Sequence, residues 1–535
     1  MDHSKRKRLY LLAISAMLMC DGADAWVSST APTAVAASSR RRHSVSIRHM
    51  QPSNDVFEKA TTGSNRRRLD TLAASSLTSS ELLLHPSRRK ATSAWWQDVQ
   101  NHVLPVLSAS LLITGNTVGA GMLVLPDLAA GPGLGISTTI FAAAYVVNWI
   151  SGVLIAEVAI TQHDASGDDV PSSFQEFAQA NLPMEEGGDV SAANWISGIS
   201  VMVNALVLAF NMAKVGEFGA EVTLMPGIAA PISAAWAVGC VALVGTQSFT
   251  NLSSITSVLV FGLFASFAGL LLPGLAHMEQ GPMELLLHTP GTSPDIVASA
   301  CQLAPIVLMS LVYQNIVPTV TKMLDYDRTK SMTAISLGSF LPLGMYIAWA
   351  FCVVGGGLED ADGMTGSLLE GSLMTLFTLT TIAGSSIGCV MSLAEEFDSF
   401  GVMEGTFGNN LFEEKKENEN DDEKFAFTSV LLSVASAAIA LQFFQQDLNG
   451  ALKVAGSFGS PLLYGVFPVI MAYNQRQARA SDMDQQQLLP RAPLPLPLEL
   501  PNVSLGLLGV ASTGFVGNEL LQSAQDVLST TWTPI

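Results

Sequence analysis

Gly115, Gly119 and Gly121 fall within seven positions of the stretch SLLITGNTVGAGMLVLP, inside a long apolar run. Polar Asn116 and Thr117 lie between the first two glycines. Each glycine costs a helix about 1 kcal/mol relative to alanine, and a helix surrounded by lipid must satisfy its backbone hydrogen bonds internally. The stretch therefore predicts a helix break at which bare N–H and C=O groups face a cavity, where they could hold a carboxylate and an ammonium group.

A second polar cluster interrupts the apolar run LAPIVLMSLVYQNIVPTVTKML. Tyr313, Gln314 and Asn315 lie together, and Pro318 removes the backbone donor that would bond to the Gln314 carbonyl. The two clusters occupy equivalent places, since 115–121 shifted by 198 positions becomes 313–319. Their coincidence predicts a shared binding site. Taken alone, the glycines are more typical of a Gly-x-x-x-G motif for close packing of membrane helices.

The composition is that of an integral membrane protein. Of the 535 residues, 49% are apolar and 13% are charged, whereas soluble proteins carry roughly 25% charged residues. Apolar runs predict ten membrane-spanning helices and a weaker eleventh. Their expected limits are 101–128, 135–161, 195–222, 228–247, 251–274, 299–323, 332–355, 371–396, 425–444, 450–473 and 502–522.

The first ten spans fall into two sets of five, with equivalent spans starting 198, 197, 176, 197 and 199 residues apart. This spacing predicts repeat one over 101–274 and repeat two over 299–473. Because five is odd, the repeats must be inverted relative to each other, as in many secondary transporters. We predict an all-α polytopic membrane protein of about eleven transmembrane helices, with broken first and sixth helices. Its ten-helix core covers 96–475, a linker covers 476–501, and the eleventh helix and a tail cover 502–535.

The N-terminal region has the composition of a targeting sequence. Residues 1–25 combine the basic SKRKR, a 12-residue apolar core and an Ala-Asp-Ala cleavage site, which predicts a signal peptide. Residues 26–95 are expected to be a transit peptide and a disordered tail. The pair resembles the bipartite plastid address of algae with secondary plastids, and predicts the plastid envelope. The alternative is a plain secretory signal with a Ser/Arg-rich tail, which would leave the chain in an endomembrane or the plasma membrane.

Charge is distributed unevenly along the chain. Residues 1–95 hold 15 of the 26 Lys and Arg but 7 of the 45 acidic residues. The strongly acidic remainder argues against nucleic acid as a partner. Lys and Arg next to the spans concentrate on the side of the N-terminus, which predicts that this side is the inner one. The five cysteines lack CxxC spacing and predict no disulfide framework.

Several stretches resemble the aromatic and hydroxy amino acid permeases, that is, the tyrosine-specific and tryptophan permeases. GNTVGAGMLVLP is similar to the first-helix signature of that family, and LVYQNIVPTV resembles the sixth span of its plant plastid members. KSMTAISLGSFLPLGMYIAW is similar to the seventh span, and GSFGSPLLYGVFPVIMAY to the tenth. The resemblance implies a proton-coupled amino acid importer with eleven spans, in the amino acid–polyamine–organocation superfamily.

The same resemblance implies roles for individual positions. Gly115, Asn116, Thr117, Gly119, Ala120 and Gly121 would hold the carboxylate and amine of the substrate. Tyr313, Gln314 and Asn315 would complete that grip or line the side-chain pocket, although bacterial members usually have Phe-His-Gly there. Ser385 and Ser386 could donate hydrogen bonds to substrate or ion, and packing of small residues explains them equally well.

Proton coupling requires an ionisable group within the membrane. Glu157, in SGVLIAEVAI, is the candidate, and the alternative is a side chain that extends to the inner interface. Lys214 precedes Glu217 and Glu221 by one and two turns, so an ion pair along one helix face is expected. Anchoring at the outer interface is the favoured interpretation of these three residues.

The leading prediction is a proton symporter of Tyr, Trp or Phe that acts as a monomer among membrane lipids. The alternatives are a carrier of another neutral amino acid, a sodium-driven symporter, or a non-transporting membrane sensor. An enzyme is not expected, because the spans supply no convergent His, Cys–His or paired-carboxylate group. No metal site and no cofactor other than the coupling ion are expected.

Overall fold

The computed structural model describes residues 102–119, 121–166, 171, 173–182, 191–278, 281–287, 293–356, 368–399, 425–444, 447–482 and 501–531. The predicted signal and transit peptides, 1–25 and 26–95, lie outside the described residues, as does most of the linker 476–501. The fold presented here is that of Lys90–Gln525, one of two units into which the chain divides. The described residues form helices and no strands, which confirms the predicted all-α class.

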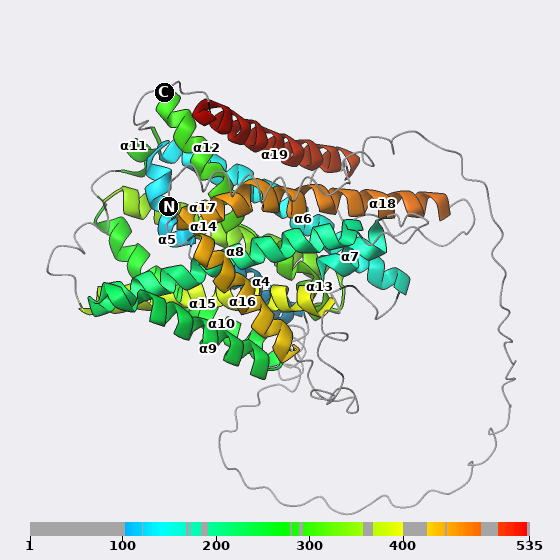
Figure 1. Ribbon diagram of the computed structural model, residues 1–535, viewed down its shortest axis with the longest axis horizontal. Helices are drawn as coiled ribbons and strands as arrows, with labels where there is room; N and C mark the ends of the chain where they lie inside the picture. Colours follow the sequence, from blue (N-terminus) through cyan, green and yellow to red (C-terminus); the bar gives the residue numbers. More distant parts are fainter. Residues whose placement is uncertain are drawn as a thin grey trace, which may run out of the picture. The chain divides into compact units, whose positions relative to one another are not determined.

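The first half of the core contains six helices that form five spans, together with short connecting helices (Figure 1). In chain order the elements are α4 (Leu104–Thr117), α5 (Gly121–Ala130), α6 (Leu134–Ser166), α7 (Phe174–Asn181), α8 (Ser191–Thr223), η2 (Pro226–Ile228), α9 (Ala229–Thr246), α10 (Phe249–Ala276) and α11 (Pro282–Leu287).

The second half follows the same plan. Its elements are α12 (Ser293–Ser310), η3 (Gln314–Ile316), α13 (Val317–Met323), α14 (Arg328–Val354), α15 (Leu368–Ser399), α16 (Phe427–Phe444), α17 (Leu448–Val454), η5 (Ala455–Gly459), η6 (Pro461–Val466), α18 (Phe467–Asp482) and α19 (Pro501–Thr531). Within the described residues, nine helices are long and apolar enough to cross a membrane, or ten if α4 and α5 count as one bent span. A shorter apolar segment, Leu505–Leu521, occupies the place of the predicted eleventh span.

The first span is broken as predicted. α4 ends at Thr117, and Val118 adopts an extended conformation with its N–H bonded to the Thr114 carbonyl at 2.9 Å. α5 begins at Gly121, and the two helices are bent by 60°. The first backbone N–H groups of α5 consequently have no acceptor within their own helix.

The sixth span is also broken, slightly earlier than expected. α12 ends at Ser310, one 3₁₀ turn covers Gln314–Ile316, and α13 starts at Val317. Pro318 lies in the first turn of α13, where proline is favoured because its missing N–H would have no helical partner. The proline therefore starts the second half-helix instead of ending the first.

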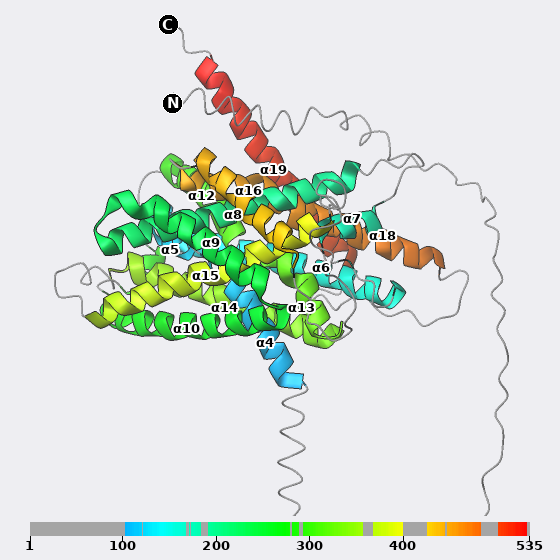
Figure 2. The same ribbon diagram turned by 60° about the horizontal axis from the view of Figure 1, so that its bottom comes forward.

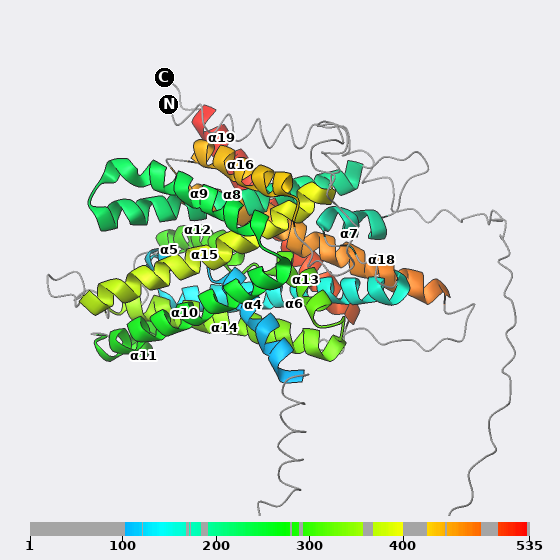
Figure 3. The same cartoon turned by 90° about the horizontal axis from the view of Figure 1, so that it is seen from below.

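The two halves pack in equivalent ways. α4 lies against α10 and α14, and its counterpart α12 lies against α17 and α6. Figure 2 shows α4 beside α10, α13 and α14, and Figure 3 shows α8, α9 and α16 grouped together. This correspondence supports the predicted 5+5 repeat and brings the two breaks together at the centre of the core.

Candidate binding site

A hydrogen bond joins the two helix breaks directly. The Nδ2 atom of Asn116, in the last turn of α4, donates to Oδ1 of Asn315 in η3 at 3.0 Å. Asn315 in turn donates from Nδ2 to Oδ1 of Asn204 in α8 at 3.4 Å. The structure therefore connects both predicted polar clusters to a third helix through a chain of amides.

A cavity lies at this junction, with an empty volume of about 470 Å³ including the solvent at its mouth. Both breaks and the helices α8, α14, α15 and α17 contribute to its wall. Its lining residues are Asn116, Thr117, Gly119, Gly121, Asn204, Val207, Phe210, Asn211, Met309, Ser310, Val312, Asn315, Tyr346, Ser385, Cys389 and Leu452.

Glycine allows a close approach where the first break meets the cavity wall. A Cβ atom on Gly119 would lie 2.8 Å from Oγ of Ser385 in α15, and one on Gly121 would lie 2.5 Å from Oγ of Ser310 in α12. Both distances are well below van der Waals contact. The Ser310 hydroxyl is buried and has no hydrogen-bond partner within the protein, so a polar donor or acceptor faces the cavity unused.

Tyr346 of α14 contacts the carbonyl groups that both breaks release. Its hydroxyl lies 3.2 Å from the carbonyl oxygen of Thr117 and 3.2 Å from that of Ser310. These are the last residues of α4 and α12, where the helix dipole places partial negative charge. A cationic group in the cavity would meet the same two oxygens.

Gly115 has a different environment from Gly119 and Gly121. A Cβ atom there would clash with the Val260 side chain of α10, and a Cβ on Gly384 of α15 would lie 2.8 Å from the Gly115 carbonyl oxygen. Gly115 thus lets three helices approach closely, as the Gly-x-x-x-G alternative described. Ala120 lies outside the described residues.

Tyr313 and Gln314 are buried and point toward α6, away from the residues that line the cavity. Gln314 donates from Nε2 to Oδ1 of Asn148 at 2.6 Å, and the Tyr313 hydroxyl donates to the Asn148 carbonyl at 3.3 Å. Asn148 also donates to the free Leu308 carbonyl of α12 at 3.1 Å. In this conformation the pair stabilises the broken helix, and its predicted contact with substrate stays a prediction.

The two serines of α15 face different neighbours. Ser385 lines the cavity and accepts a 3.0 Å hydrogen bond from Asn211 Nδ2. Ser386 instead accepts a 3.3 Å bond from the indole nitrogen of Trp236 in α9. The geometry therefore brings Ser385 to the other site residues and directs Ser386 toward a neighbouring helix.

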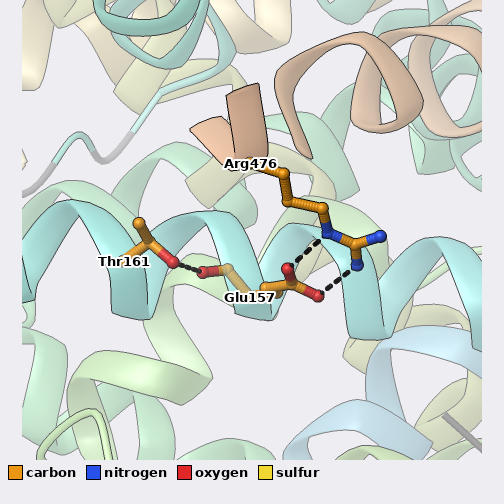
Figure 4. A network of polar contacts seen from close by, with 3 residues as sticks. All are labelled: Glu157, Thr161 and Arg476. Carbon is orange, nitrogen blue, oxygen red and sulfur yellow. Dashed lines mark hydrogen bonds and ion pairs between the residues drawn. The ribbon is translucent and has the colours of Figure 1, made fainter. Parts of the chain in front are cut away.

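Glu157, the predicted coupling group, is held in a buried ion pair (Figure 4). Nε of Arg476, in α18, donates to Oε1 of Glu157 at 2.9 Å, and Nη2 donates to Oε2 at 2.8 Å. The Glu157 side chain is 3% exposed, and its predicted role in coupling stays a prediction. Lys214 pairs with Glu217 at 2.6 Å, as expected from their spacing, and lies 5.7 Å from the centre of the Phe210 ring.

Sequence reasoning missed three buried polar residues near the site. Asn204 and Asn211 lie seven positions apart in an apolar run of α8, a spacing that puts both on one helix face. Glu396 of α15 is 1% exposed, although its place at the end of an apolar run resembles that of an interfacial residue. Within the described residues, no group of three or more His, Cys, Asp or Glu side chains could hold a metal ion.

Comparison with known proteins gives a consistent result. The model of the tryptophan/tyrosine permease family matches residues 104–490. A tryptophan-specific transport protein of Pseudomonas aeruginosa is 25% identical over 314 residues, which cover 54% of this chain and 70% of that protein. The tyrosine-specific transport system 2 of Haemophilus influenzae is 25% identical over 311 residues, which cover 54% of this chain and 71% of that protein. The crystal structure of MhsT in complex with L-phenylalanine shares the fold, with a TM-score of 0.52 and 12% identity over 78% of this chain and 98% of that one. These findings confirm the predicted relationship to permeases and not to enzymes: the chain belongs to the tryptophan/tyrosine permease family.

Proposed function

We propose that the protein is a secondary active transporter that carries aromatic amino acids together with protons across a plastid membrane. The observation that carries the proposal is the cavity between the two broken helices, which combines free helix ends with an apolar wall. A zwitterion with a large apolar side chain has matching chemistry.

The helix ends supply the partial charges that complement the carboxylate and ammonium groups of an amino acid. The N-terminus of α5, at Gly121, presents backbone N–H groups and a positive dipole end to a carboxylate. The carbonyl oxygens of Thr117 and Ser310 present negative dipole ends to an ammonium group. The Ser310 hydroxyl, which lacks a partner, can complete either contact.

The side chain of the substrate would lie against the apolar part of the wall. This part is formed by Val207, Phe210, Met309, Val312 and Leu452. An aromatic ring gains dispersion and ring-pair energy there, and the similar bacterial proteins carry the names tryptophan-specific and tyrosine-specific. A carrier of another neutral amino acid is the alternative, and competition experiments separate the two.

Proton coupling, a plastid location and a monomeric state complete the proposal. Coupling to protons is supported by buried carboxyl groups within the spans, and a sodium-driven symporter is the alternative. The plastid location is supported by the composition of residues 1–95.

Uptake into proteoliposomes tests the function. The full-length chain should accumulate labelled tyrosine when a pH gradient is imposed, and unlabelled tryptophan and phenylalanine should compete more strongly than alanine. A sodium gradient at equal pH should give no accumulation. Absence of any tyrosine exchange would refute the transporter, and accumulation driven by sodium alone would replace the proton with sodium.

A further inference from the structure

Glu396 is a buried carboxyl group with neutral partners. It lies in the last turn of α15, three residues before the helix ends at Ser399. Oε1 accepts a 2.9 Å bond from the backbone N–H of Phe174, and Oε2 accepts a 2.6 Å bond from the Ser197 hydroxyl. No Lys or Arg within the described residues pairs with it. Glu396 therefore differs from Glu157, whose carboxylate accepts two hydrogen bonds from Arg476.

From these contacts we propose that Glu396 is the group that carries the coupled proton. The inference deepens the proposed symport and rests on it. A carboxylate without a counterion in a low-dielectric interior carries a large desolvation cost, which binding of a proton removes. A carboxylate that an arginine already neutralises gains much less from a proton, so Glu157 is the poorer carrier.

The hydrogen bonds specify which oxygen takes the proton. The Phe174 N–H can only donate, so Oε1 must stay an acceptor. Ser197 can rotate its hydroxyl and accept instead of donate, so the proton adds to Oε2 and the carboxylate becomes a neutral acid. On the other side of the membrane the same O–H bond breaks and one proton leaves, with no change in the covalent structure of protein or amino acid.

Polar groups connect Glu396 with the cavity. Asn204, Ser200 and Ser197 lie on one face of α8, because they are separated by four and three residues. Asn204 lines the cavity and donates to the Ser200 carbonyl at 3.0 Å. The buried Ser200 hydroxyl adjoins the Glu396 carboxyl, and the buried Tyr464 hydroxyl adjoins both Glu396 and Asn204. These hydroxyls provide sites for a proton or a water between the substrate and the carboxyl.

Among the described residues, the ionisable groups on the elements packed against Glu396 do not neutralise it. From η6 the Tyr464 hydroxyl adjoins the carboxyl, and Cys389 lies two turns earlier on α15. Glu176 lies in the first turn of α7, and Asp398 accepts a 2.5 Å bond from Ser429 of α16. None of these groups is basic, so none of them is a counterion for the Glu396 carboxylate.

Protonation also affects a contact between helices. Phe174 is the first residue of α7, so its N–H belongs to the positive end of that helix. The other end of α7 is tied to α18, since Gln475 Nε2 donates to Asn181 Oδ1 at 2.8 Å. Loss of the carboxylate charge weakens the charge-assisted bond from Phe174. Proton binding at Glu396 thus weakens the contact between the start of α7 and α15.

Two assays with the full-length chain in proteoliposomes test the proposal. The first measures exchange of labelled for unlabelled tyrosine at equal pH, and the second measures accumulation driven by a pH gradient. Glu396→Gln should keep exchange within about twofold of the wild type and lose gradient-driven accumulation. Glu217→Gln, an exposed carboxyl converted in the same way, should keep both. Wild-type protein without exchange would refute the proposed transport itself.

Two results would overturn the role of Glu396 alone. One is normal accumulation by Glu396→Gln, and the other is a folded Glu396→Gln that has lost exchange as well. If that variant does not fold, Ser197→Ala gives a second test with the carboxyl intact. Loss of a bond to the charged carboxylate should move the pH of half-maximal uptake upward by about one unit. An unchanged pH profile in Ser197→Ala would overturn the proposal.

Discussion

Asn116 and Asn315 lie 199 positions apart and share a 3.0 Å hydrogen bond between their side-chain amides. Each belongs to the break of its own repeat, and the offset is almost that between the two repeats. The bond therefore joins pseudo-equivalent positions across the centre of the transporter. Since Asn315 also contacts Asn204 of α8, the two breaks and a third helix are joined by one chain of side-chain amides.

Asn116→Ala and Asn315→Ala should each lower the kcat/KM of tyrosine uptake about tenfold. Each change leaves the other amide of the pair without this bond, and Asn315→Ala also leaves Asn204 without its bond; a lost partner costs about 1–3 kcal/mol. The double variant should lose less than the product of the two single losses, because the shared bond is removed only once. Uptake kinetics of the four proteins measure this coupling. Asn251→Ala, at the exposed start of α10, is the control, and independent, multiplicative losses would contradict a functional bond.

Much of the fold was predictable because its signals are local. Runs of apolar residues define the spans, and glycines or a proline mark each break within a few residues. The second break begins earlier than predicted because proline is tolerated in the first turn of a helix, so Pro318 starts α13. Contacts between distant helices depend on tertiary packing, which the sequence does not show directly. The constant spacing between equivalent spans of the two repeats was the main indication of which helices pack together.

Gly119→Ala should abolish tyrosine uptake while leaving insertion and folding intact. The added Cβ would lie 2.8 Å from Oγ of Ser385, so it would fill the opening between the first break and α15. Gly344→Ala is the matched control, because a Cβ at this helical glycine of α14 meets nothing within 4 Å. Uptake by Gly119→Ala at the wild-type rate would remove the first break from the site.

The site was only partly predictable, for two physical reasons. Side-chain direction does not follow the α-helical period across a break that contains a 3₁₀ turn, so the sequence could not reveal that Tyr313 and Gln314 face Asn148 while Asn315 faces the cavity. Glu396 ends an apolar run in the same way as an interfacial residue does. Packing against α7 and α8, which the sequence does not reveal, buries the carboxyl.

A fluorescent protein fused after residues 1–60 should enter plastids in an alga with secondary plastids. The apolar core of the signal should direct the fusion into the secretory pathway, and the Ser/Arg-rich segment should then direct it across the plastid envelope. A fusion that lacks residues 1–25 should stay in the cytosol. Microscopy distinguishes these locations, and retention of the full fusion in the endoplasmic reticulum would contradict the plastid address.

Phe210→Ala should raise the KM for tyrosine and tryptophan about two- to tenfold. A ring pair contributes about 0.5–1.5 kcal/mol beyond its buried area, and Phe210 forms part of the apolar cavity wall. Inhibition of tyrosine uptake by alanine should change much less, since its side chain cannot reach a ring pair. Phe261→Ala, an exposed ring on α10, is the control. Equal losses for all substrates would show that Phe210 does not determine selectivity.

Replacing one partner of the Glu157–Arg476 pair should strongly destabilise the protein. The pair is buried, with side-chain exposures of 3% and 15%, and loss of one partner from such a pair costs about 3–5 kcal/mol because the other charge stays uncompensated. Thermal unfolding in detergent should show a large drop for Glu157→Gln and for Arg476→Met. The double variant Glu157→Leu/Arg476→Met should recover most of the loss, because no unpaired charge remains. Glu217→Gln, which breaks an exposed pair, should change stability by less than about 1 kcal/mol.

The double variant Glu157→Leu/Arg476→Met also tests whether Glu157 or Glu396 carries the coupled proton. If the Glu157–Arg476 pair only holds α6 to α18, a folded double variant should still accumulate tyrosine in response to a pH gradient. If Glu157 carries the proton, accumulation should disappear although the protein melts near the wild-type temperature. Gradient-driven uptake by the stable double variant would therefore assign a structural role to Glu157, and its loss would restore Glu157 as the coupling group.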